Sequence, residues 1–182
     1  MLFRPAGRKS TLKELNIIIV ALPLYEQHGA QIEETYRMSN GVSLQVAADV
    51  AQLATIRAFV EQHSRALGID AYGIYDLILA VNEAATNIVA HGYRGRPGTI
   101  EIQLRQRGDA IEIALRDHAP LFDPTQVPTP DLTLPLHKRP LGGMGVHVTR
   151  ELMDDIRYRV TAGGGNELIL VKRAVVADRH KE

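Results

Sequence analysis

Hydrophobic residues recur along most of this sequence at one of two spacings, which predict strands and helices respectively. Every second residue is apolar over 42–46, which predicts a strand with one buried face. Apolar residues recur at helical spacing over 49–67, which predicts a helix that ends at Gly68. A second helix is expected over 72–91. Its apolar stripe consists of Ile74, Leu77, Ile78, Val81, Ala85, Ile88 and Val89.

The clearest strand pattern follows in TIEIQLRQRGDAIEIALRD at 99–117. The alternation runs through both halves of this segment and is interrupted at RQRGD, so two strands joined by a tight turn are expected. A second strand pair, about a glycine turn, is expected over 156–173. The buried face of the first hairpin would consist of Ile100, Ile102, Leu104, Ile111, Ile113 and Leu115.

A proline-rich segment separates the two strand pairs. Six of the nine prolines lie between Pro120 and Pro140, which argues against a helix or the interior of a sheet and predicts a long loop. Loops of this length inside compact domains are commonly lids over a site. The glycine-rich GGMG at 142–145 then leads into a helix. Its buried side would hold Val146, Thr149 and Met153.

These elements fit a single domain. A chain of 182 residues can bury one core, and strands and helices intermix without a repeat or a compositionally biased linker. We therefore expect an α/β (α+β) sandwich with helices on one face of the sheet. Residues 41–175 would form this domain, with 1–40 as an N-terminal appendage of open role and 176–182 as a C-terminal tail. Met38 is an alternative start of translation.

Composition narrows the range of partners. Lys and Arg total 21, as do Asp and Glu, so no net charge favours nucleic acid or an anionic membrane. The absence of cysteine excludes a disulfide scaffold and cysteine-ligated metal sites. The strongest apolar run, at 17–22, is far shorter than the roughly 20 residues that span a bilayer. A cytoplasmic protein without a nucleic-acid or membrane partner is expected.

The helix predicted over 72–91 also carries a polar pattern. Glu83 and Asn87 are four residues apart and project away from the apolar stripe. Such a pair is typical of a solvated helix face. Ala80, Ala84 and Ala90 flank it, however, at positions where long charged side chains are common. The second interpretation is therefore that this side of the helix is one wall of a site.

Asp117 ends the first predicted hairpin on its buried side. Counting by twos from Ile111 reaches Asp117, and a buried carboxylate needs hydrogen-bond donors. It is either a cap of the following turn or an acceptor for a ligand group such as an exocyclic amine.

The segment before the last predicted helix offers a second candidate for ligand binding. Gly142, Gly143 and Gly145 permit close backbone approach, and the helix N-terminus that follows favours an anion. A plain turn explains the same glycines. Lys138 and Arg139 either contact the phosphate groups of an anionic ligand bound there or are solvated.

Taken in this order, the motifs NEAATNIVAHGY, RDHAPLFDP and GGMGVHVTRELMDD resemble the GHKL ATPase family, and within it the anti-sigma factor serine kinases. The resemblance covers roughly residues 42–173. It implies a Bergerat-type ATP-binding fold with a mixed, mostly antiparallel sheet. It also implies a serine/threonine kinase that uses ATP and Mg²⁺, phosphorylates an anti-anti-sigma (STAS-domain) partner and regulates transcription by partner switching with a sigma factor.

The resemblance also implies roles for individual residues. Glu83 would be the general base, Asn87 a Mg²⁺ ligand, and Asp117 the acceptor for the adenine amino group. The glycines of GGMG, which are Gly142, Gly143 and Gly145, would shape the phosphate-binding end of the lid.

Two positions depart from the family pattern. Ala119 replaces a glycine two residues after Asp117, and Asn166 with Glu167 replaces the threonine usual after the last glycine turn. We expect Asn166 to remain able to hydrogen-bond a base edge, so the departures bear more on turnover than on binding. The alternative function is a non-catalytic nucleotide-binding module that acts by sequestering a partner. A kinase whose target is not a sigma factor, and a homodimer, also stay open.

Overall fold

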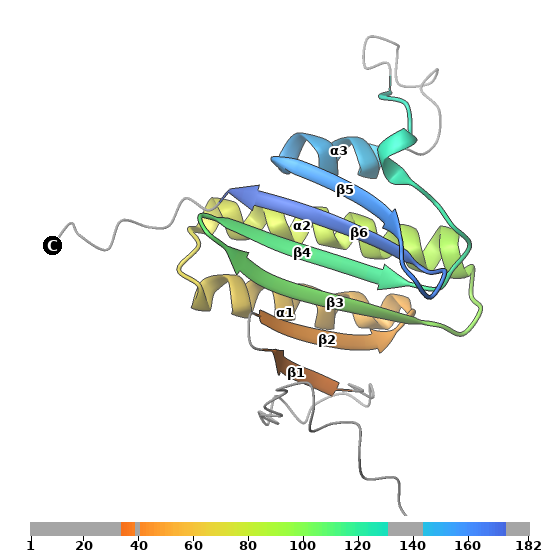
Figure 1. The fold of residues 1–182 in the computed structure, drawn as a ribbon, viewed down its shortest axis with the longest axis horizontal. Helices are drawn as coiled ribbons and strands as arrows, with labels where there is room; N and C mark the ends of the chain where they lie inside the picture. The colour runs from red at the N-terminus through yellow and green to blue at the C-terminus, as the bar shows by residue number, and fades with distance from the viewer. Residues whose placement is uncertain (1–33, 39–40, 131–143, 174–182) are drawn as a thin grey trace, which may run out of the picture.

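The structure, a computed structural model, describes residues 34–38, 41–130 and 144–173. Its six strands form one sheet in the order β1-β2-β3-β4-β6-β5 (Figure 1). The expected α/β class and mostly antiparallel sheet are confirmed, and every pairing between described strands is antiparallel. The strands are β1 (Glu34–Met38), β2 (Gly41–Ala47), β3 (Thr99–Arg107), β4 (Ala110–Asp117), β5 (Asp155–Val160) and β6 (Asn166–Arg173).

The hairpin of β3 and β4 has the register that the alternation predicts. Leu104 pairs with Ile113 and Ile102 with Leu115, and all four side chains are buried. Gly108 adopts φ 61° in the two-residue turn, a left-handed conformation that glycine reaches without strain. β1 pairs with β2 and so extends the sheet to residues before 41. The division into an appendage at 1–40 and a domain at 41–175 stays a prediction.

The helices cover one face of this sheet. They are α1 (Leu53–Ala66), α2 (Ala71–Asn87) and α3 (Met144–Leu152). In Figure 1, α1 and α2 lie behind the sheet. Residues within α1 and α2, and residues at the end of α3, pack with the strands in one hydrophobic core. Asp49 caps the short 3-10 helix η1 (Val50–Gln52) ahead of α1, and Gly68, at φ 79°, follows the end of α1. Both helix limits agree with the sequence.

The second helix differs from its prediction at both ends. It begins at Ala71 because Asp70 accepts a hydrogen bond from the backbone N–H of Gly73, at 2.7 Å. After Asn87 it widens into one π-helical turn, η2 (Ile88–Tyr93), which ends at Arg94 in a left-handed conformation. π-Helical turns are rare and occur often at functional sites. The regular helix expected to continue to residue 91 is therefore replaced by a wider turn directly after Asn87.

The alanines on the polar side of α2 are explained largely by packing. Ala80 and Ala84 are buried, and α2 packs against α3, with Ala84 beside Val146 and Thr149 of α3. The small side chain of Ala84 lets α3 approach closely. Ala84 also contributes to a cavity at the end of α2, whereas Ala90 is exposed. The two interpretations of this face were each incomplete, because a helix covers much of it.

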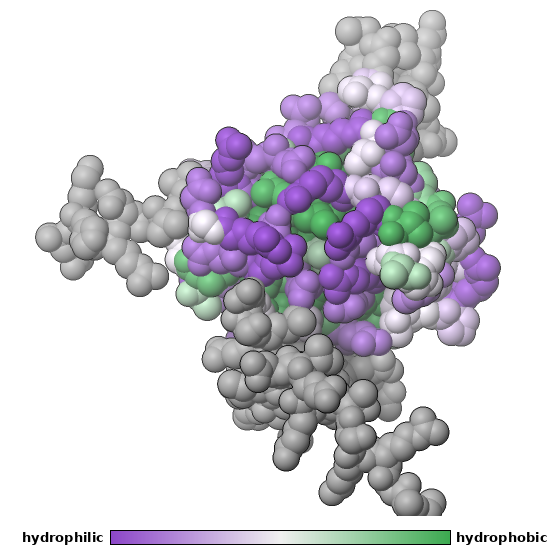
Figure 2. Space-filling view, viewed as in Figure 1, coloured by the Kyte–Doolittle hydropathy of each residue, from purple (hydrophilic) through white to green (hydrophobic). Residues whose placement is uncertain are grey.

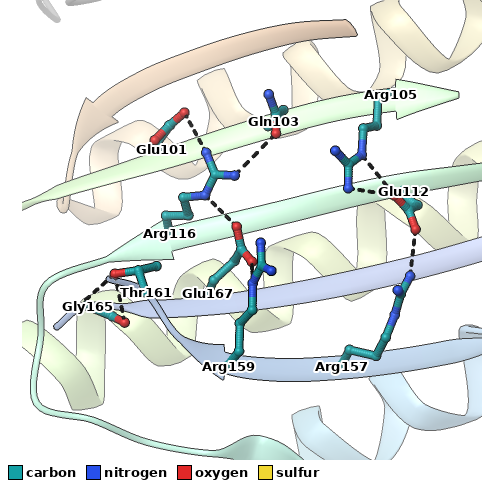
Figure 3. A network of polar contacts seen from close by, with 10 residues as sticks. All are labelled: Glu101, Gln103, Arg105, Glu112, Arg116, Arg157, Arg159, Thr161, Gly165 and Glu167. Atoms are coloured by element: carbon teal, nitrogen blue, oxygen red, sulfur yellow. Dashed lines mark hydrogen bonds and ion pairs between the residues drawn. The ribbon is translucent and has the colours of Figure 1, made fainter. Parts of the chain in front are cut away.

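The face of the sheet opposite the helices is polar. Figure 2 shows it as largely hydrophilic, with apolar surface between the charged side chains. The carboxylates of Glu112 and Glu167 are nevertheless buried, because arginines from other strands of the sheet extend over them (Figure 3). Arg105 and Arg157 bind Glu112, and Arg116 and Arg159 bind Glu167.

These arginines set the acidity of the two carboxyls. Burial raises the pKa of Glu167, but hydrogen bonds from Arg159 and Arg116 and the attraction of both guanidiniums outweigh it, so the pKa lies below its usual value. The pKa of Glu112 is lowered in the same way, because the hydrogen bonds and charges of Arg157 and Arg105 outweigh the effect of burial, which raises it. Both carboxylates therefore stabilise the folded state above the unfolded pKa of about 4.5 and lose this contribution as pH falls through the lower folded value.

We expect Glu167→Gln to lower the free energy of unfolding by about 1–3 kcal/mol at pH 7, because two charge-assisted hydrogen bonds are lost. The loss should shrink as pH falls below about 4.5, where the carboxyl of the unfolded chain becomes protonated, and it should vanish once pH falls through the lower pKa of the folded protein. Urea unfolding at pH 7 and pH 3.5 measures both effects. Glu61→Gln is the matched control, since Glu61 forms an exposed pair with Arg65 on α1 and should change stability by less than about 0.5 kcal/mol at either pH. If Glu167→Gln lowers the free energy of unfolding no more than the control does, the Glu167 carboxylate does not stabilise the fold as expected.

Candidate functional site

A cavity of about 490 Å³ lies where α2 and η2 meet the ends of β4 and β6 and the start of α3. This volume is within the range typical of small-molecule sites. Its polar lining includes Asn87 from α2, Asp117 from β4 and Asn166 from β6. Two of the residues expected to bind a nucleotide therefore lie around one space.

Asp117 is buried, as the alternation of side chains along β4 predicted, and one of its carboxylate oxygens is already hydrogen-bonded within the protein. Oδ1 accepts hydrogen bonds from the backbone N–H of Ala119 at 2.8 Å and from Nδ2 of Asn166 at 2.9 Å. No described residue donates to Oδ2. The carboxylate therefore both caps the following turn and keeps an acceptor for a ligand, so the two interpretations of Asp117 are compatible.

The backbone after Asp117 is fixed by its neighbours. Tyr93, the last residue of η2, accepts a hydrogen bond from the N–H of His118 at 3.0 Å and donates to the carbonyl of Thr99 at 3.1 Å. Ala119 is buried, and its methyl lies opposite Gly92, where a β-carbon would approach it to 2.9 Å. Gly92 thus makes room for the methyl group that replaces the family's glycine.

Asn87 lies in the cavity wall, where none of the described residues engages its side chain. It precedes the π-helical turn but makes no capping hydrogen bond to it, and no other described residue hydrogen-bonds to its amide. An amide with free oxygen and nitrogen next to a cavity can bind a ligand group or a cation through its oxygen.

Glu83 lies one helical turn before Asn87, between α2 and α3. It is half-buried, and a β-carbon on Gly145 would collide with its Oε2, so the glycine is needed for the carboxylate to reach the start of α3. No described residue forms a hydrogen bond or ion pair with this carboxylate. Glu83 is not among the residues that line the described cavity. Its role as a base stays a prediction.

The remaining predicted residues divide between described and undescribed parts of the chain. Gly145 lines the cavity at the start of α3. Lys138, Arg139, Gly142 and Gly143 lie outside the described residues, as does the second half of the expected lid, residues 131–140. The described part of that loop contains the short helix η3 (Pro124–Gln126), whose carbonyls at Pro124 and Thr125 accept hydrogen bonds from Arg150 of α3.

The sequence analysis missed several cavity residues with aromatic or charged side chains. Tyr158 of β5, Phe122 after β4 and Arg94 after η2 all contribute to the lining. No motif contains Tyr158, and only the sheet order, which places β5 beside β6, brings it to the site. Asn166 was expected to reach a base edge, but its amide is engaged with protein groups instead.

Comparison with known proteins agrees with this site and fold. Residues 46–172 match the family model of the histidine kinase-like ATPase domain. The chain therefore belongs to this family, in the branch of the anti-sigma factor serine kinases, which confirms the resemblance found in its motifs.

Several similar relatives share one name. Serine-protein kinase RsbW from Bacillus cereus (strain Q1) and from Bacillus thuringiensis subsp. konkukian (strain 97-27) are each 30% identical over 120 residues, covering 64% of this chain and 75% of theirs. A crystal structure of the RsbU and RsbW domains of Rv1364c from Mycobacterium tuberculosis is similar in fold. That likeness has a TM-score of 0.51 at 20% identity and covers 78% of this chain and 38% of that chain. Among the described helices, none is long and apolar enough to cross a membrane.

Proposed function

We propose that this protein is an ATP-dependent serine/threonine kinase of the anti-sigma factor type, acting in the cytoplasm. It phosphorylates a serine of an anti-anti-sigma (STAS-domain) partner and regulates transcription by partner switching with a sigma factor. The observation that carries the proposal is the cavity that holds Oδ2 of Asp117 and the amide of Asn87, with the carboxylate of Glu83 one turn away, none of which receives a hydrogen bond from a described residue. The name shared by the relatives, serine-protein kinase, supports the same activity.

In this proposal the two ends of the cavity bind the two ends of the nucleotide. Asp117 accepts a hydrogen bond from the adenine amino group through Oδ2, because Oδ1 is already held by Ala119 and Asn166. The apolar lining from Ile88, Val146 and Leu168 contacts the base and sugar. The phosphates extend toward Gly145, where the lack of a side chain allows close approach.

Asn87 fits the role of a Mg²⁺ ligand. Its side-chain oxygen forms no hydrogen bond with a described residue and adjoins the cavity, and Mg²⁺ in nucleotide sites is held by few protein oxygens together with phosphates. The described residues contain no cluster of three or more His, Asp or Glu side chains that could hold the ion without a nucleotide. When bound, Mg²⁺ neutralises charge on the phosphates.

Glu83 is the proposed general base. A base needs a free carboxylate within reach of the attacking hydroxyl, and no described group competes for this one. It would accept the proton of the partner's serine as the serine oxygen attacks the γ-phosphorus, while the bond to the β–γ bridging oxygen breaks and ADP leaves. Lys138, Arg139, Gly142 and Gly143 are proposed to complete the phosphate-binding end.

One observation favours the alternative of a non-catalytic nucleotide-binding module. The carboxylate of Glu83 adjoins Gly145 at the α2–α3 contact instead of lining the described cavity. Such a module would bind ATP and sequester its partner without phosphate transfer. Transfer of the γ-phosphate to the partner therefore separates the two functions, whereas nucleotide binding tests what they share.

We expect Asn87→Ala to weaken ATP binding about tenfold or more in the presence of Mg²⁺ and to leave binding in EDTA nearly unchanged, because only the metal contact is lost. Isothermal calorimetry under both conditions measures the difference. Asn82→Ala is the matched control, since Asn82 lies on the same helix but binds Arg57 at the surface. Equal losses with and without Mg²⁺ would rule out the ligand role, and a wild-type protein that binds no ATP would refute the proposed function.

A further inference from the structure

Asn166 has all of its side-chain hydrogen-bonding capacity engaged at the edge of the cavity. It is buried, and Nδ2 donates to Oδ1 of Asp117 at 2.9 Å and to the carbonyl of Ala119 at 3.2 Å. Its Oδ1 accepts from the N–H of Phe122 at 3.1 Å and from the hydroxyl of Tyr158 at 2.7 Å. An amide has two donors and two acceptor positions, so this set is complete.

The arrangement fixes which way the amide faces. If oxygen and nitrogen were exchanged, the oxygen would meet the carboxylate of Asp117 and the carbonyl of Ala119, which are both acceptors. The pKa of Tyr158 is raised by burial and then by the charges of Asp123 and Asp117, so its hydroxyl remains a donor. Asn166 therefore presents an N–H to Asp117 and cannot offer a free group to a base.

Strand pairing makes the contact rigid. Asp117 and Asn166 are directly opposite in the β4–β6 pair, and Asn166 is opposite Val160 in the β5–β6 pair. A carboxylate free to rotate would share its two oxygens among the available donors. With Oδ1 held by two N–H groups, only Oδ2 stays available to the cavity.

We propose that Asn166 is a positioning residue for nucleotide recognition: it orients Asp117 so that Oδ2 is a dedicated acceptor for an amino group on the bound base, without itself touching the base. This inference rests on the proposed function, because it concerns the same nucleotide site. The threonine of the family is thus replaced here by a residue that acts through Asp117 and also ties Phe122 and Tyr158 to the rim.

The test compares ATP with purine riboside 5′-triphosphate, which lacks the exocyclic amine. Asn166→Ala should weaken ATP binding about tenfold to a hundredfold, as expected for loss of a well-oriented hydrogen bond to a charged group. Binding of the amine-free nucleotide should change less than about threefold, since it makes no contact with Asp117. In an Asp117→Ala background, Asn166→Ala should have almost no further effect on ATP, because the two residues act through one interaction.

Equal weakening of both nucleotides, or full additivity with Asp117→Ala, overturns the inference, because it marks Asn166 as merely structural. Tyr158→Phe removes only one hydrogen bond to Asn166 and decides the matter if Asn166→Ala does not fold. A weakening selective for ATP supports the inference, and an equal weakening or none overturns it. A wild type that binds neither nucleotide refutes the proposed function and this inference together, whereas a wild type that binds both equally refutes the inference alone.

Discussion

Glu83→Ala should reduce phosphate transfer about 10²- to 10⁴-fold, the range typical of losing a general base. ATP affinity should stay within about threefold of wild type, because the carboxylate does not line the described cavity. Folding should be preserved, since Glu83 is half-buried and makes no hydrogen bond or ion pair with a described residue. Transfer of labelled γ-phosphate in single-turnover reactions measures the first effect, and calorimetry the second.

The matched control for this experiment is Glu151→Ala. Glu151 is an exposed carboxylate on α3, so its loss tests for a general effect of charge near the site. We expect its transfer rate to equal that of wild type. If Glu83→Ala transfers phosphate as fast as the control, Glu83 is not the base.

Asp117→Asn should weaken ATP binding about a hundredfold while sparing the fold. Oδ1 of Asp117 accepts two N–H groups, so the oxygen of the new amide takes that place and its nitrogen takes the place of Oδ2. A donor then faces the adenine amine, which is itself a donor. The same change should favour inosine triphosphate relative to ATP, because its 6-oxo group is an acceptor.

Calorimetry with ATP and inosine triphosphate measures this change in preference. Asp109→Asn is the control, since Asp109 lies in the exposed turn between β3 and β4. If Asp117→Asn binds ATP as the control does, Oδ2 is not the acceptor for the base.

The strands and helices of the scaffold could be predicted where hydrophobic residues recur at a regular spacing along the sequence. The alternation through 99–117 gave both the hairpin and the buried position of Asp117, because in a strand the side of each residue follows from parity alone. The apolar stripe of α2 likewise placed Glu83 and Asn87 off the core. Local chemistry at Asp49 and Gly68 predicted the start of η1, which leads into α1, and the end of α1.

The parts that depend on distant segments could not be predicted. The polar side of α2 gives no sign that α3 packs beside Ala84, since α3 is more than fifty residues away in the sequence. The partners of Asn166 come from β4, from the loop after it and from β5, so its sequence context suggested only that it could face a base. The π-helical turn after Asn87 has no local signature of the kind that glycine or proline gives to a turn.

The measurement that tests the proposed kinase most directly is phosphorylation of a partner. The wild-type protein would be incubated with Mg²⁺ and γ-labelled ATP together with each anti-anti-sigma domain encoded in the same genome, and the products mapped by mass spectrometry. The account predicts that one such domain acquires phosphate on a serine with wild type and with Glu151→Ala, and does so far more slowly with Glu83→Ala. An anti-anti-sigma domain that binds the protein in the presence of ATP but acquires no phosphate would contradict it and establish the non-catalytic module.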